Sequence, residues 1–242
     1  YTSLTSFARI RRHNVPGYHT PLHEFMASVY RVGLRSTMSL LLARCYEYYF
    51  DFRFGVDTLA RVELESLRIE SQSACRGQMY QPTGVLQLRS IFNTIPFDEN
   101  SVFVDYGSGK GRVLLMAAQL PIRRVVGIEF SGELCDVARR NVAIFENSRA
   151  LRPVNVVHGD AQEYKYQGDE NVFYFFYPFD RDVMSTVVAH IESSLEECPR
   201  DAFLVYYYAV HEDAVFSSTR FTLASETTLF GYRCVVYEHK RL

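Results

Sequence analysis

The stretch "VFVDYGSGKGRVLLMAA", residues 102–118, changes character at its centre. An apolar run typical of a buried strand ends in Asp105, and an apolar run of helix-forming residues begins after Gly111. Between them, Gly107, Gly109 and Gly111 leave every second position without a side chain. A strand–glycine loop–helix pattern lets a ligand approach the main chain closely, although a tight turn without a ligand has the same composition.

Three kinds of ligand loop compete for this pattern. A phosphate-binding P-loop places Ser or Thr after its Gly-Lys pair, but here Gly111 follows Lys110 and Val104 stands where the first glycine belongs. A dinucleotide loop has the spacing G-x-G-x-x-G, and here the third glycine comes one residue too early. The ligand that remains is S-adenosylmethionine, which carries no phosphate and lies across the carboxyl edge of the same kind of sheet.

Acidic residues stand at the ends of three successive predicted strands. Glu129 is suited to accept hydrogen bonds from both ribose hydroxyls, and Asp160, in "HGDA", from the adenine amino group. Asp105 is expected under the loop, where it holds the ammonium group of the ligand directly or through water. Three carboxylates suit a cationic sulfonium nucleoside better than a pyrophosphate. Ordinary solvated carboxylates at strand ends are the alternative for Glu129 and Asp160.

From about residue 100 onwards, strand-like and helix-like segments alternate. The first five strands are short, nearly continuous apolar runs, as in parallel sheets covered on both faces. The last stretch reads as two strands around a turn at Gly231, which predicts an antiparallel hairpin. The expected fold class is α/β, with a Rossmann-like, doubly wound, seven-stranded sheet. We expect the five parallel strands at 102–106, 124–130, 154–158, 171–177 and 202–208.

The first hundred residues lack a strand series and look largely helical. Helices are expected at 23–50, 57–70 and 83–95, the last with Thr83 as its N-cap after Pro82. We interpret residues 1–77 as a helical cap that shapes the substrate pocket, and residues 78–242 as the catalytic domain.

Four quoted segments carry a family resemblance. "VDYGSGKGR", "VVGIEFS", "HGDA" and "FYFFYPF" together resemble the class I S-adenosylmethionine-dependent methyltransferases over about residues 78–242. "YQPTG" before the first strand, with D-x-G-S-G-x-G, resembles the Dot1-like branch and its bacterial relatives, which includes protein lysine methyltransferases. "FDFRFGVDT", residues 50–58, resembles a segment of uncharacterised bacterial members.

The resemblance implies a set of residues around the cofactor S-adenosyl-L-methionine. Tyr80 and Thr83 are expected over its methionine end, with a simple helix cap as the alternative. The other implied cofactor contacts are Asp105, Gly107, Ser108, Gly109, Gly111, Glu129, Phe130, Gly159, Asp160, Ala161 and Tyr177.

The fourth strand ends in "FYPF", residues 176–179, where the acceptor site is expected. Many amino-group methyltransferases have Asn or Asp, then Pro, then an aromatic residue at this point, but Tyr177 replaces the polar residue here. A phenol can still orient an oxygen or a nitrogen, so Tyr177 is a candidate catalytic residue. Pro178, Phe179 and Tyr208 are the expected substrate contacts. His211 is a candidate base, and an exposed loop histidine is the alternative.

Composition limits the partners. A net charge of −2 gives no basic surface for nucleic acid, and no uncharged apolar run is long enough for a membrane span. The scattered cysteines and the prolines between His13, His19 and His23 argue against a metal site. A cytoplasmic location is therefore expected.

The expected function is transfer of a methyl group to a protein side chain or a small metabolite, at nitrogen or oxygen. The altered acceptor motif keeps open a non-catalytic cofactor-binding module that serves as a partner or regulatory subunit. A nicotinamide-dependent oxidoreductase has the right sheet but the wrong glycine spacing.

Overall fold

A computed structural model describes residues 30, 33–59, 82–149, 151–216 and 220–241 of the 242-residue chain. The chain divides into two compact units, Tyr1–Arg44 and Cys45–Leu242, and the boundary falls within helix α2 (Leu34–Phe54). In the first unit, the described residues are Tyr30, Gly33 and the first part of α2. The expected division at residues 77 and 78 stays a prediction. The description that follows concerns the second unit.

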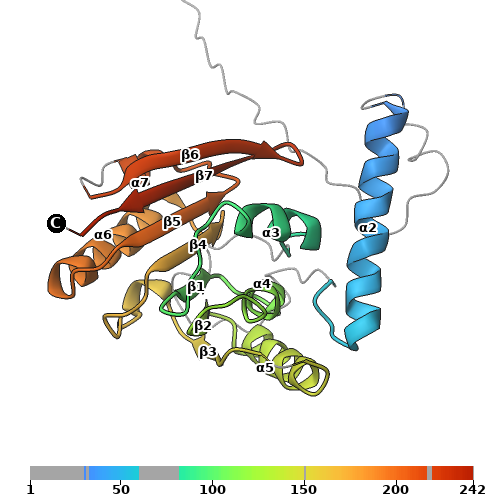
Figure 1. Ribbon diagram of the computed structural model, residues 1–242, viewed down its shortest axis with the longest axis horizontal. Coiled ribbons are helices and arrows are strands. Elements are labelled where there is room, and N and C mark those ends of the chain that lie inside the picture. Colours follow the sequence, from blue (N-terminus) through green and yellow to red (C-terminus); the bar gives the residue numbers. More distant parts are fainter. Residues whose placement is uncertain (1–29, 31–32, 60–81, 150, 217–219, 242) are drawn as a thin grey trace, which may run out of the picture. The chain divides into compact units, whose positions relative to one another are not determined.

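One seven-stranded sheet, in the order β3-β2-β1-β4-β5-β7-β6, forms the centre of this unit (Figure 1). The first five strands are parallel, and β7 runs antiparallel to both of its neighbours. The predicted Rossmann-like sheet with a terminal antiparallel hairpin is therefore confirmed. The strands are β1 (Val102–Tyr106), β2 (Arg124–Glu129), β3 (Val154–His158), β4 (Val172–Phe176), β5 (Ala202–Tyr207), β6 (Thr222–Leu229) and β7 (Tyr232–His239).

Helices cover both faces of the sheet, and each side has its own apolar core. On one side, α3 (Val85–Phe92), α4 (Arg112–Ala117) and α5 (Gly132–Glu146) bury their apolar faces against β1, β4 and β5. On the other, α6 (Arg181–Glu197) supplies most of the helical side chains that pack against the strands. Because both faces are covered, all five residues of β1 are buried. This burial explains its continuous apolar sequence.

The order of the strands reverses between β1 and β4. From β1 the chain proceeds to β2 and β3 on one side, and then returns to β4 and β5 on the other. In open α/β sheets, ligands bind outside the carboxyl ends of the strands at such a reversal. The glycine loop follows β1 directly, so it lies at this point of the sheet.

The hairpin ends the sheet at β6, whose first seven residues are exposed. The pairing register of β6 with β7 shifts between Leu223 and Ser225, which marks an irregularity in the strand. The two edges of the sheet are therefore β3 and this polar, irregular strand.

The N-terminal helices were predicted only in part. The described part of α2 ends at Phe54, four residues beyond the predicted end at 50, and α3 occupies the centre of the predicted 83–95. Residues 57–59 are not helical, and the rest of the predicted 57–70 lies outside the described residues. Thr83 as N-cap is wrong. Gly84 holds that position without a side-chain bond, and Glu47 Oε1 accepts from the Val85 N–H at 2.8 Å instead.

The start of α4 is fixed by a buried cation. Arg112 is 2% exposed, and its guanidinium pairs with Glu47 from α2 and donates to Thr58 Oγ1 at 2.8 Å. Its Nη2 lies 3.5 Å from Asp51 Oδ1, which is a charge contact without hydrogen-bond geometry. Asp51 in turn accepts from the backbone N–H of Thr58 at 2.7 Å and of Leu59 at 2.8 Å. Segment 47–59 is thus tied to the residue that follows the glycine loop.

A second set of bonds joins the same segment to the loop itself. The Lys110 ammonium, 4% exposed, lies 2.9 Å from Asp57 Oδ2. The Asn141 amide on α5 donates to the carbonyls of Asp57 at 2.8 Å and Lys110 at 2.9 Å, and accepts from the Asp57 N–H. Lys110 in the glycine loop and Arg112 directly after it are therefore both buried side chains that tie the loop to segment 47–59.

Replacing Arg112 with methionine is expected to lower the free energy of unfolding by about 3–5 kcal/mol, because Glu47 and Asp51 are left near each other without a cation. Adding Glu47→Gln to that variant removes one of these charges and is expected to restore part of the loss. Urea unfolding checks both variants, with Arg140→Met on the exposed side of α5 as the control, expected to change stability by under about 0.5 kcal/mol. Equal stability of Arg112→Met and the control would show that the buried pair is not holding the segment.

Candidate functional site

The glycine loop uses its three glycines for backbone conformation and for close packing. Gly107, Gly109 and Gly111 have φ of 77°, 52° and 85°, a region that residues with a Cβ seldom adopt. A Cβ on Gly107 would lie 3.0 Å from the Cβ of Pro178, and one on Gly111 would lie 3.2 Å from the Cβ of Ala138. The first glycine thus brings the loop against the segment after β4, and the third seats α4 on α5.

Glu129, at the end of β2, joins the loop to the neighbouring strand. Its Oε2 accepts from the Gly109 N–H and its Oε1 from the Ser131 N–H, both at 2.9 Å. The N–H groups of Gly107 and Ser108 both donate to the Ile128 carbonyl. Glu129 is 3% exposed, and burial raises its pKa while the backbone N–H groups oppose that rise. The carboxylate is therefore a structural part of the loop, and it still has lone pairs that accept no bond from these groups.

Two buried polar atoms at the loop have no hydrogen-bond partner within the described part of the chain. They are Asp105 Oδ2, at the end of β1, and Ser108 Oγ, in the loop. Burial, together with the nearby charge of Glu129, raises the pKa of Asp105 well above its ordinary value. A Cβ on Gly127 of β2 would lie 2.7 Å from Ser108 Oγ, so this glycine makes room for the hydroxyl. Unsatisfied buried polar groups are costly, and they mark a place built for a polar ligand.

The third acidic residue lies one strand further along the edge. The Gly159 N–H donates to the Glu129 carbonyl at 3.0 Å, which places the end of β3 beside the end of β2. Asp160 is half-buried and caps the short 3₁₀-helix η3 (Ala161–Glu163) through the Gln162 N–H. Phe130 is also half-buried, and its carbonyl oxygen accepts from His158 Nε2 at 3.1 Å. The three predicted acidic residues thus follow three adjacent strands.

Thr83 lies close to the same region, beneath the sheet edge. Its hydroxyl is 3.0 Å from the hydroxyl of Tyr174, and both side chains are buried. Tyr174 is the partner of Asp105 in the β1–β4 pairing. Tyr80, the other residue predicted at the methionine end of the cofactor, lies outside the described residues.

The predicted acceptor residues gather beyond the ends of β4 and β5. Tyr177 and Tyr208 have φ of 43° and 57°, conformations that cost energy for residues with a Cβ. Their rings meet edge to face with centroids 5.2 Å apart, and the ring of His211 lies 5.5 Å from that of Tyr177. Partial burial, with a smaller effect of Tyr208, raises the pKa of Tyr177, so its phenol stays protonated at neutral pH.

Pro178 and Phe179 continue from Tyr177 and are half-buried. Phe179 packs against the core on the α6 side of the sheet. Pro178 packs against the glycine loop, since its Cβ lies 3.0 Å from the position that a Cβ on Gly107 would occupy. The structure therefore brings the predicted substrate contacts next to the predicted cofactor loop.

Sequence reasoning missed the residues that support this edge from behind. Glu212 is 8% exposed, pairs with Arg233 of β7 and accepts from the Tyr237 hydroxyl. The Tyr208 N–H donates to the Arg233 carbonyl at 2.8 Å. These contacts hold the strained turn after β5. The only sequence signal is the adjacency of Glu212 to His211, which does not indicate the partner strand.

The Arg112 network was missed as well. Segment 50–58 was noted for its resemblance to bacterial relatives, and it supplies Asp51, Asp57 and Thr58 to the glycine loop. Lys110 and Arg112 lie in and directly after a loop that is expected to hold a cationic ligand. Their positive charges are a sequence signal that carboxylate partners occur elsewhere in the chain. They are compatible with such a ligand because internal carboxylates pair with them.

No group of His, Cys, Asp and Glu able to hold a metal occurs among the described residues, and His13, His19 and His23 lie outside them. No helix in the described part of the chain is long and apolar enough to cross a membrane.

Comparison with known proteins gives one family match. The model of the family "Histone methylation protein DOT1" matches residues 60–171. No curated protein matches the chain.

The solved structures to which this chain is similar include methyltransferases of low sequence identity. A putative methyltransferase, yhhF, from Escherichia coli is 14% identical, with TM-score 0.53, over 76% of this chain and 100% of its own. The Bacillus subtilis M1A22 tRNA methyltransferase TrmK is 19% identical, with TM-score 0.50, over 64% of this chain and 65% of its own. An RNA methyltransferase from Salinibacter ruber, in complex with S-adenosyl-L-homocysteine, is 20% identical, with TM-score 0.49, over 66% and 94%.

The strand order, the glycine loop at the reversal point and the family match agree with one another. The chain therefore has the fold of the S-adenosylmethionine-dependent methyltransferases, and its residues 60–171 match the DOT1 family.

Proposed function

We propose that this methyltransferase acts on a protein side chain or a small metabolite, at nitrogen or oxygen, bound against Tyr177 and Tyr208. The observation that carries the proposal is the pair of tyrosines with positive φ at two adjacent strand ends. Strained conformations of this kind persist where the surrounding structure enforces them, and they cluster at functional sites. The family match to histone methylation proteins favours a protein amine among these acceptors.

The cofactor residues divide by chemistry. When bound, S-adenosylmethionine supplies a methyl group on a positively charged sulfonium. Asp105 Oδ2 and Ser108 Oγ are the buried atoms available for the polar methionine end. Glu129 has unused lone pairs for the ribose hydroxyls, and Asp160 lies one strand further along, for the adenine. The order of these groups along the sheet edge, from β1 to β2 to β3, corresponds to the order of the ligand's parts, from the amino-acid tail through the ribose to the adenine. Thr83 and Tyr80 complete the proposed methionine end.

Catalysis in this proposal rests on alignment. Methyl transfer needs the acceptor atom in line with the methyl group and water kept away. The protonated Tyr177 hydroxyl suits the role of a hydrogen-bond donor or positioning group rather than a base. His211, with its ring beside that of Tyr177, is the candidate base for an acceptor that has to lose a proton.

A nucleic-acid acceptor is the second candidate. TrmK, which shares the fold, is a tRNA methyltransferase, and the charge of −2 argues against a large phosphate-binding surface. The expected absence of nucleic-acid partners and the expected cytoplasmic location stay predictions.

Transfer of label from methyl-labelled S-adenosylmethionine into a source-cell lysate tests the acceptor class. Label in macromolecules that resist nuclease but not protease would support a protein acceptor, and label in the small fraction a metabolite. Label removed by nuclease would contradict the proposal in favour of RNA or DNA. No label with intact S-adenosylhomocysteine binding would favour a non-catalytic module.

Tyr177→Phe is expected to lower transfer roughly tenfold, with S-adenosylhomocysteine affinity unchanged, since one hydrogen bond is lost.

Glu129→Ala is expected to weaken S-adenosylhomocysteine binding by about 1.5–3 kcal/mol, the range for hydrogen bonds to a charged group. Isothermal titration calorimetry measures the loss, and a thermal melt of the cofactor-free protein reports the effect of losing the loop bonds. Glu133→Ala, an exposed acidic residue in the first turn of α5, is the matched control and is expected to bind normally. A folded Glu129→Ala protein with unchanged affinity would remove this residue from the cofactor site.

Asp105→Asn is expected to change how stability depends on pH. The folded pKa of Asp105 is raised, so the folded state holds a proton that the unfolded chain releases. The stabilisation is full below the unfolded pKa of about 3.9 and is lost as pH rises through the folded value. Thermal melts from pH 5 to 8 should therefore show the parent losing stability relative to Asp105→Asn. If the melting temperatures of the parent and of Asp105→Asn changed with pH in parallel, the carboxyl of Asp105 would not have the raised pKa. The variant is also expected to bind the cofactor more weakly.

A further inference from the structure

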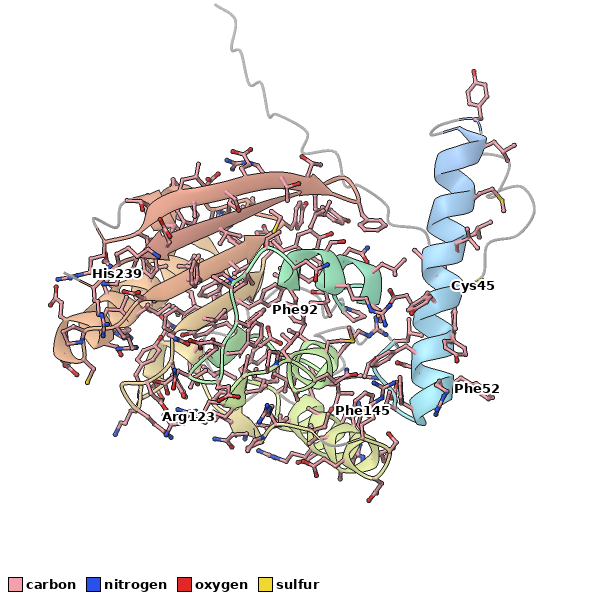
Figure 2. The ribbon with its side chains drawn as sticks, viewed as in Figure 1. Cys45, Phe52, Phe92, Arg123, Phe145 and His239 are labelled. Atoms are coloured by element: carbon pink, nitrogen blue, oxygen red, sulfur yellow. The ribbon has the colours of Figure 1, made fainter. Side chains whose placement is uncertain are left out.

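A cavity of about 400 Å³ lies among the helices on one face of the sheet, apart from the glycine loop. Its walls come from the second half of α2, from the end of α3, from the end of α4 with the residues that follow it, and from Arg149, which lies beyond α5. Phe50, Phe92 and Met116 are buried residues of its lining, and Figure 2 labels Phe92 on α3. The volume is within the usual range of small-molecule sites.

The cavity is positively charged. Arg53, Arg89 and Arg149 line it, and the described lining includes no Asp or Glu. None of the three forms an ion pair within the described part of the chain. Arg89 Nη1 donates to the Tyr46 hydroxyl and Arg149 Nη1 donates to the Gln119 side-chain oxygen, both at 2.9 Å. Their bonds to neutral groups leave most guanidinium N–H groups available to an anion.

Aromatic rings hold the three guanidinium groups at the cavity. Arg53 and Arg149 lie 5.4 and 5.0 Å from the ring centre of the same residue, Phe54, and Arg89 lies 5.3 Å from that of Tyr46. Stacking fixes each cation at little entropic cost for a later contact. Two like charges held against one ring without a counter-charge repel each other, and an anion would relieve that repulsion.

The position of the cavity separates it from the cofactor site. The glycine loop precedes α4, whereas the cavity is lined by Met116, Gln119 and Leu120 at its other end. The Arg152 N–H donates to the Ala118 carbonyl, which joins this end of α4 to the segment that enters β3. The cavity is therefore at the amino ends of the strands, and the cofactor residues follow the carboxyl ends.

We propose that this cavity is a second binding site, for a small aromatic anion of the size and charge of a nucleoside monophosphate. The aromatic walls offer faces for a planar ring, and the arginine forks match the oxygens of a phosphate group, to which they donate paired hydrogen bonds. We expect neither part to be sufficient alone, because the planar ring would contact aromatic side chains of the lining and the phosphate would contact the arginines.

Calorimetric titration of the full chain with AMP, in the presence of saturating S-adenosylhomocysteine, tests the site. S-adenosylhomocysteine keeps the cofactor site filled, so any AMP binding that is still measured reports on the cavity. We expect AMP to bind, and adenosine and inorganic phosphate each to bind at least about tenfold more weakly. Absence of AMP binding at millimolar concentration, or its loss when S-adenosylhomocysteine is added, would overturn the proposal.

Single variants locate the site. Arg53→Ala, Arg89→Ala and Arg149→Ala are each expected to weaken AMP binding about tenfold or more, the effect of losing hydrogen bonds to a charged group. These side chains are on exposed positions, so the fold should survive, and a thermal melt verifies it. Arg140→Ala removes an equal charge from an exposed position outside the cavity and is expected to bind AMP normally. Equal losses in all four variants would mean general charge attraction and would refute the site.

Discussion

The position of the glycine loop depends on the carboxylate of Glu129. One oxygen holds Gly109 in the loop and the other holds Ser131 at the start of α5, so a single side chain links β1, β2 and the helix that follows. The same group is the proposed ribose contact, and the loop and the ligand therefore share one acceptor. Since the oxygens retain unused lone pairs, cofactor binding does not require the loop to be released. Cofactor affinity therefore depends on how firmly the carboxyl ends of β1 and β2 are held in place.

The charged groups around this loop differ in their pairing, because the cations have carboxylate partners, whereas the carboxyl groups of Asp105 and Glu129 form no ion pair among the described residues. Burial, and to a smaller extent the nearby charge of Glu129, raises the pKa of Asp105, so keeping this carboxyl ionised costs stability in the absence of a cation. Behind the loop, Lys110 and Arg112 are paired with Asp57 and Glu47. The positive charges are thus neutralised internally, and the negative ones are left for a cationic ligand. Active sites commonly keep such unfavourable arrangements at the expense of stability.

The sheet was predictable because its signals are local. Each parallel strand appears as a short apolar run, and the glycine spacing with Asp105, Glu129 and Asp160 places the loop and the strand ends. The links between distant segments were not predictable. Glu47 bonds Val85 and Arg112, at separations of 38 and 65 residues, and no pattern in the sequence indicates those partners. Thr83 looked like a helix cap because Thr is a common N-cap, but the Tyr174 hydroxyl engages it instead. The positive φ of Tyr177 and Tyr208 was also not predictable, because tyrosine is not a residue type that favours this conformation.

An open sheet has to avoid growing by one more strand, and β6 shows how this chain does so. A regular, apolar edge strand offers its free N–H and C=O groups to a strand of another molecule. Along β6, Thr222, Ser225 and Glu226 face solvent and the register is broken after Leu223, so a partner strand would meet polar side chains and a misaligned ladder. The hairpin that completes the fold therefore also protects the folded protein against edge-to-edge aggregation at high concentration.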